Sequence, residues 1–227
     1  MKFPQSLAVL LLLCSCIGYG QAAKKHAPKT HASTNQAPAK AAPNKKFFAL
    51  IVGNAFTLPE CQKRGLPSPM YRPGEPHWCW KDPSGTPKSG DPAPPPVNED
   101  VLVHFPPDDA PVYSISSGLN CRVENGKLQR ITFHTNGTRA TEEVTEALTA
   151  LYGQPTQKLP VTVENNVGDP FPSVNSLWLY SDLAVDYRAV DGDLSLGTVW
   201  IETPLAHAER IKAGKKAAEE AKEKKTK

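Results

Sequence analysis

After its first 22 residues the sequence lacks any apolar run long enough to cross a bilayer, which takes about 20 residues. It also lacks the H-E-x-x-H and C-x-x-C motifs of metal sites, the phosphate-binding P-loop and the glycine-rich dinucleotide fingerprint. These absences predict no metal, no cofactor and no catalytic residues. They also predict no transmembrane span once the N-terminal segment has been removed.

The N-terminal segment has the features of a secretory signal. Lys2 supplies a positive start, residues 7–13 form an apolar run, and Gly20-Gln21-Ala22 offers small residues at the cleavage site. The sequence therefore predicts a signal peptide over residues 1–22 and an exported protein, periplasmic or secreted.

A second processing route is present within the same segment. Leu13-Cys14-Ser15-Cys16 resembles the bacterial lipoprotein box, and this resemblance implies a lipid anchor on Cys16. We favour ordinary cleavage after Ala22, because the small residues at that site are well placed. Anchoring at Cys16 stays open as the alternative.

Lysines are concentrated at both ends of the remaining chain. Residues 23–46 hold six lysines and no acidic residue, with too little apolar surface to offset the entropy of ordering. They are predicted to form a disordered basic tether rich in Ala, Pro and Lys. Residues 212–227 hold seven lysines, three glutamates and no apolar residue larger than alanine, which predicts a charged helical tail.

Residues 47–211 then carry 12 basic and 20 acidic side chains, a net charge of −8, and have the length of a single domain. This acidic domain lies between two basic segments, residues 23–46 and 212–227. The basic segments are either solvated tails without a partner or segments that contact an anionic surface. The acidic domain and the export signal argue against a nucleic-acid partner.

The most distinctive local feature is a proline-rich stretch over residues 65–111, with 13 prolines. This density disfavours helices and central strands over most of the stretch and predicts a long loop, which is often functional. The loop carries aromatic and histidine side chains that suit a partner or sugar surface, and these are the candidate binding residues: Tyr71, His77, Trp78 and Trp80. We favour the other interpretation, in which both tryptophans fold back and anchor the loop on the core, because large exposed apolar patches are rare.

Three cysteines follow the signal, an odd number in an oxidising compartment. Cys61 and Cys79 flank the first part of the proline-rich loop, and we predict a disulfide between them. Cys121 alternates in phase with Leu119 and Val123 on an expected strand, so it is predicted to be a buried free thiol.

The remaining pattern is mostly that of strands. Residues 47–52 form an apolar run expected to be one strand buried on both faces. A hairpin follows over residues 119–133, and a three-residue loop, Glu124 to Gly126, would bring its apolar residues to one face. That apolar set is Leu119, Cys121, Ile131 and Phe133.

Residues 141–152 have the clearest helical pattern, with Thr141 as the expected cap and Gly153 as the end. Strands are expected over residues 177–180, 183–190 and 196–203, the second with one wet face. Thr203-Pro204 should then open a C-terminal helix that docks through Leu205 and Ile211. The fold class predicted is α+β, an antiparallel sheet with the central helix packed on one face.

Two functions fit these features. The first is a non-catalytic envelope module that binds an envelope protein or a polysaccharide through the aromatic loop. The second is a hydrolase of wall or secreted substrates, for which Glu60 or Glu75 near His77 would be the best residues.

Overall fold

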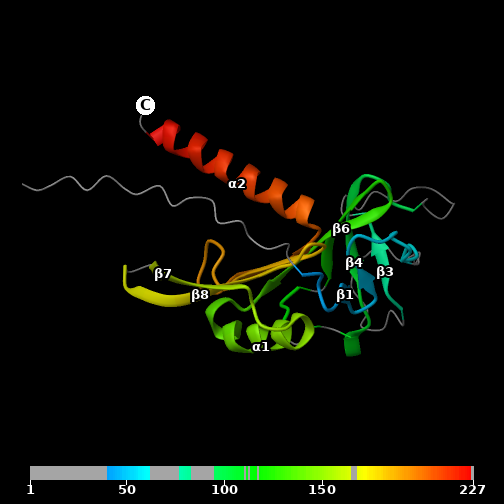
Figure 1. Cartoon of the computed structure of the whole chain (residues 1–227), viewed down its shortest axis with the longest axis horizontal. Helices are drawn as coiled ribbons and strands as arrows, with labels where there is room; N and C mark the ends of the chain where they lie inside the picture. The colour runs from blue at the N-terminus through cyan, green and yellow to red at the C-terminus, as the bar shows by residue number, and fades with distance from the viewer. Residues whose placement is uncertain are drawn as a thin grey trace, which may run out of the picture. The chain divides into compact units, whose positions relative to one another are not determined.

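The computed structural model describes residues 40–61, 77–82, 95–109, 111, 113–116, 118–164 and 168–225. Their centre is an eight-stranded antiparallel sheet with the strand order β3-β4-β5-β6-β10-β9-β8-β7 (Figure 1). The strands are β3 (Cys79–Lys81), β4 (Glu99–His104), β5 (Leu119–Glu124), β6 (Lys127–Thr135), β7 (Gln157–Glu164), β8 (Pro170–Leu179), β9 (Ala184–Arg188) and β10 (Gly197–Glu202). Two helices, α1 (Thr141–Tyr152) and α2 (Pro204–Lys225), accompany it, with two short 3₁₀ helices, η1 (Pro107–Asp109) and η2 (Gly137–Ala140). The predicted α+β class is confirmed.

The sheet consists of two consecutive four-stranded meanders, β3 to β6 and β7 to β10, joined where β6 pairs with β10. Helix α1 lies between the two meanders in the sequence and packs on one face of the sheet, as the sequence predicted. Two strands, β3 and β4, fall within the expected proline-rich loop, so the prediction of one continuous loop over residues 65–111 was wrong at these positions.

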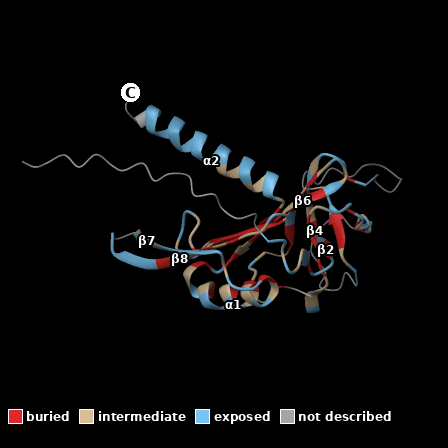
Figure 2. Cartoon of the chain, in the orientation of Figure 1, coloured by how far each residue is buried: buried red, intermediate tan, exposed pale blue. Residues whose placement is uncertain are grey.

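The core lies between α1 and the sheet (Figure 2). Val144, Leu148 and Tyr152 of α1 are fully buried, and so is Trp178 of β8. The Trp178 indole N–H donates a 2.7 Å hydrogen bond to the carbonyl of Gly153, where the chain leaves α1 with a φ of 80°. The predicted helix end is therefore confirmed, and an indole satisfies an open carbonyl beside it.

The predicted helix cap was wrong. The cap residue is Ala140, which follows the 3₁₀ helix η2, and Thr141 is the first residue of α1. The Thr141 hydroxyl donates back to the carbonyl of Gly137. The sequence pattern did not indicate the extra 3₁₀ turn that precedes α1.

The β5–β6 hairpin also differs from its predicted loop. Asn125 and Gly126 form a two-residue turn with φ values of 51° and 69°, and Glu124 pairs with Lys127. A bulge beyond Val123 then shifts the register so that Cys121 faces Ile131. The predicted apolar face is still confirmed, because the bulge restores the phase that the short turn would have lost.

Residues 47–52 do not form one strand. The chain reverses within the run and makes a small hairpin, β1 (Lys46–Phe47) and β2 (Leu50–Ile51). Phe47 and Leu50 are buried, whereas Phe48 at the turn is exposed and has a φ of 53°. The apolar composition predicted burial correctly for half of the run but could not indicate the turn.

The second meander follows its prediction on the core face only. The inward-facing residues of the predicted alternation are all fully buried: Leu183, Val185, Tyr187 and Ala189. The opposite face was expected to be exposed to solvent, yet Ala184 and Asp186 are buried there as well. The reason is α2, whose first turns lie over that face and contact Trp200 and Asp186.

Helix α2 begins where the sequence predicted. The Thr203 hydroxyl accepts a hydrogen bond from the backbone N–H of Ala206, and Pro204 is the first helical residue. Docking through Leu205 was wrong, because 67% of this residue is exposed. His207 and Arg210 make the contact instead, through polar groups that an apolar pattern does not reveal.

Several predictions lie outside the described residues. They concern the signal over residues 1–22, anchoring at Cys16, the tether up to residue 39, and the side chains of Tyr71 and Glu75. Within the described ranges, no helix is both long enough and apolar enough to span a membrane.

Candidate functional site

A disulfide fixes the aromatic part of the proline-rich stretch. Cys61 and Cys79 are bonded, with 4.8 Å between their Cα atoms, as the sequence predicted. Backbone hydrogen bonds reinforce it on both sides, from Cys61 N–H to the carbonyl of Trp80 and from Trp80 N–H to the carbonyl of Pro59. Residues 59–61 and 79–80 therefore form one cross-linked unit that positions the neighbouring Trp78.

Replacing both bonded cysteines by serine is expected to lower the free energy of unfolding by about 3 kcal/mol, because the ring they close no longer restricts the unfolded chain. Chemical denaturation of wild type and of the double variant measures the difference. Reductant should lower the stability of the wild type and leave the double variant unchanged. Equal stability of the two proteins would show that the backbone bonds alone hold this unit.

Cys121 is the one free cysteine among the described residues, and it is 1% exposed. Burial raises the pKa of its thiol well above the ordinary value. His134 lies on the opposite face of the sheet, with its Nδ1 3.1 Å from the Thr198 hydroxyl. The two residues cannot act as a thiol–imidazole pair, and Cys121 is a core residue as predicted.

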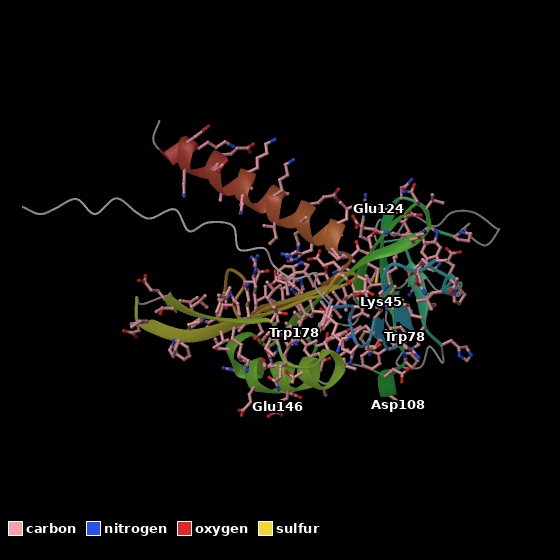
Figure 3. The ribbon with its side chains drawn as sticks, in the orientation of Figure 1. Lys45, Trp78, Asp108, Glu124, Glu146 and Trp178 are labelled. Carbon is pink, nitrogen blue, oxygen red and sulfur yellow. A yellow bond between two sulfur atoms is a disulfide. The ribbon has the colours of Figure 1, made fainter. Side chains whose placement is uncertain are left out.

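The structure places the predicted binding residues at different depths. Trp80 is 3% exposed and belongs to the core, in agreement with the anchoring interpretation. Trp78, which is labelled in Figure 3, is half-buried. Its indole N–H donates a 2.8 Å hydrogen bond to Asp109. His77 is exposed beside it. Of the predicted set, only His77 and Trp78 can reach a partner from the described surface.

Phe48 joins these two residues, and the sequence did not single it out. Its ring stacks on that of Trp78 with 5.7 Å between centroids, and Trp78 in turn lies 5.7 Å from Phe105. The ring is 37% exposed, although its own backbone is in the left-handed region, which is costly for a bulky residue. We call Phe48, His77 and Trp78 the aromatic surface.

Buried rings hold the aromatic surface rigidly from below. Phe47 meets Phe48 edge-on at 4.9 Å and stacks on Phe133 of the central strand β6 at 5.3 Å. The exposed ring is therefore connected to the core through direct contacts, and it loses little side-chain entropy when a ligand stacks on it.

A groove of about 510 Å³ begins at the residue after Phe48. Ala49, Ile51, Leu58 and other apolar groups line it, together with the polar side chains of Asn54 and Lys127. Polar and apolar atoms contribute about equally to its exposed lining. Ala49 of the groove directly follows Phe48 of the aromatic surface in the β1–β2 turn.

A second cluster lies beneath the start of α2, and we call it the α2 clamp: Asp186, Trp200, Glu202, His207 and Arg210. The Arg210 guanidinium donates to Asp186 at 2.8 Å and to Glu202 Oε1 at 2.8 and 2.6 Å. It also lies over the Trp200 ring, 4.3 Å from its centroid. His207 Nδ1 is 3.1 Å from the same Glu202 oxygen.

Glu202 and Arg210 of the α2 clamp stay ionised despite burial. Burial alone would raise the pKa of the fully buried Glu202, but hydrogen bonds from His207 and Arg210 outweigh it and hold the pKa below its ordinary value. Burial would likewise lower the pKa of Arg210, and its bonds to Glu202 and Asp186 raise it instead. These groups are used to hold α2 on the sheet, which is a structural role.

Several further polar side chains take part in turn and surface interactions. Asp191 accepts a hydrogen bond from Thr198, and Asp193 accepts two from Ser195, as expected for turn residues. Among the described residues no group of three or more His, Cys, Asp or Glu side chains is placed to hold a metal ion. Glu60, a candidate of the hydrolase interpretation, is half-buried beside Trp80.

Comparison with known protein families, with curated proteins and with solved structures finds no match to this chain. Its function must therefore be argued from the geometry of its own surface.

Proposed function

We propose that this chain is an exported, non-catalytic binding module of the cell envelope, and that its aromatic surface binds a polysaccharide. The observation that carries the proposal is Phe48, an exposed ring held in a left-handed backbone conformation. Strain of this kind persists where the surroundings enforce it, and it is concentrated at ligand sites.

The chemistry of the aromatic surface favours stacking. The indole N–H of Trp78 is already bonded to Asp109, and the Phe48 ring has no polar atom. The surface thus offers ring faces, which suit the apolar faces of sugar rings, while Asn54 and Lys127 of the neighbouring groove can bond to hydroxyl groups.

Export is supported by the N-terminal signal pattern and by the Cys61–Cys79 disulfide, which is typical of oxidising compartments. The lysine-rich part of α2 is exposed over residues 212–224, where Lys216 and Glu220 form a surface ion pair at 3.8 Å. In this proposal the basic ends bring the module to anionic envelope surfaces, an attraction that salt weakens.

Replacing Phe48 by glycine is expected to weaken binding to insoluble peptidoglycan about tenfold, through loss of a stacking ring. Its effect on folding should stay within about 1 kcal/mol, because relief of backbone strain offsets the lost ring contacts. Co-sedimentation at several protein concentrations measures binding, and thermal unfolding measures stability.

The matched control is Leu205→Ala, which removes another exposed apolar side chain, far along the sequence on α2. It should bind as the wild type does. The proposal is wrong if Phe48→Gly binds peptidoglycan as well as wild type, or if both variants lose binding equally.

A further inference from the structure

Strand β7 is an exposed edge with one apolar side. It is last in the sheet order, and among the described residues only β8 pairs with it. Leu159, Val161 and Val163 point to one side of the strand, and Leu159 is 50% exposed. Phe171, opposite Val163 on β8, extends this apolar stripe and is 44% exposed. An edge of this kind is suited to pair with another strand.

Prolines determine which backbone groups of β7 face outward. A proline has no N–H and fits a strand only where that group would point away from the partner strand. Pro160 therefore points away from β8, and by alternation so do the backbone groups of Lys158, Thr162 and Glu164. On β8, Pro172 lies opposite Thr162 and Pro170 lies opposite Glu164. Neither proline has an N–H to donate toward β7, so Thr162 and Glu164 are also positions whose backbone groups face away from β8.

We propose that β7 pairs antiparallel with β7 of a second copy of this chain, centred on Val161. Lys158 then lies opposite Glu164 of the second copy, and Glu164 opposite its Lys158. Leu159 lies opposite Val163 of the second copy, so the apolar stripes of the two sheets join. This surface is separate from the aromatic surface and does not depend on its function.

Charge and hydrogen bonding select this register. Each Lys158–Glu164 pair exchanges both backbone hydrogen bonds, and each Pro160–Thr162 pair makes one, donated by Thr162. A shift by two residues in one direction sets Pro160 against Pro160, where no backbone N–H is left to donate. A shift by two residues in the other direction moves Lys158 beyond Glu164 of the second copy, so that the two charges no longer lie opposite each other. The Val161 register alone keeps opposite charges face to face at both ends.

Sedimentation equilibrium of the mature protein tests the proposal, from about 1 to about 100 µM, the range in which a small interface dissociates. Wild type should reversibly form dimers. Lys158→Glu should weaken dimerisation about tenfold, because both charge pairs become repulsive. The double variant K158E/E164K should restore it, because the swapped charges again attract across the two-fold axis.

The control Lys215→Glu makes the same charge change at an exposed position of α2 and should leave dimerisation unchanged. Circular dichroism verifies that each variant is folded. A wild type that stays monomeric throughout would overturn the proposal and leave Pro160 as a residue that blocks edge pairing. A dimer that responds equally to K215E and K158E, or that K158E/E164K does not restore, would also overturn it.

Discussion

Arg210→Ala is expected to lower the free energy of unfolding by about 3 kcal/mol and to release the start of α2 from the sheet. The variant leaves the buried Glu202 carboxylate without its guanidinium partner, and breaking one side of a buried ion pair costs about 3 to 5 kcal/mol. We expect the lower value, since α2 can move away and let water reach Glu202. Urea denaturation gives the free energy, and hydrogen exchange over residues 204–211 shows the release.

Arg188→Ala is the matched control. Its guanidinium lies over the same Trp200 ring at 5.1 Å and within 3.8 Å of Asp186, but its side chain is 39% exposed. The loss should stay below about 1 kcal/mol. If both variants lowered the free energy of unfolding equally, Arg210 would not be the residue that holds α2 on the sheet.

The effect of Arg210 should also depend on pH. The folded-state pKa of Glu202 is below its ordinary value, so its ion pair stabilises the protein above that ordinary value and is lost as the pH falls through the folded-state pKa. The deficit of Arg210→Ala should therefore shrink in acid, because a protonated Glu202 no longer carries an unpaired charge.

Gly137→Ala is expected to destabilise the protein by about 3 kcal/mol or more. A Cβ at this position would overlap the carbonyl oxygen of Leu194 and lie 2.6 Å from the carbonyl carbon of Ser195. These are backbone atoms of the β9–β10 connection, which cannot rotate away as a side chain can. The φ of 54° adds the cost of a left-handed conformation, about 1 kcal/mol.

Gly126→Ala separates the two costs. Gly126 also has a positive φ, 69°, but nothing lies within 4 Å of the position that a Cβ would take. It should therefore lose about 1 kcal/mol, from backbone strain alone. If thermal unfolding showed equal losses for both glycine variants, the close contact between η2 and the β9–β10 connection would be wrong.

The parts of the fold that the sequence could predict depend on local periodicity. Alternation from Leu183 to Ala189 identified the buried side of β9, and the stripe through Val144 and Leu148 identified the buried side of α1. For the β5–β6 hairpin, the buried face was predictable but the turn was not. A two-residue turn with a bulge and a three-residue loop satisfy the same apolar pattern.

The features that decide the candidate sites are long-range or conformational. Arg210 meets Asp186 across 24 positions of sequence, and no periodic signal connects an arginine on a polar helix with an aspartate on a strand. Phe48 is in a left-handed turn that a phenylalanine rarely adopts, so its sequence context indicated a strand. Cys61 and Cys79 were predictable because few cysteines were available to pair.

Hydrogen–deuterium exchange with soluble peptidoglycan fragments tests the central claim, binding at the aromatic surface, most directly. We expect the fragments to slow exchange over residues 46–58 and 77–81, which carry Phe48, Trp78 and the groove. Exchange over residues 183–188 in β9 should not change. Protection confined to β9 or α2, or no protection at saturating fragment concentration, would contradict the assignment of the aromatic surface as the binding site.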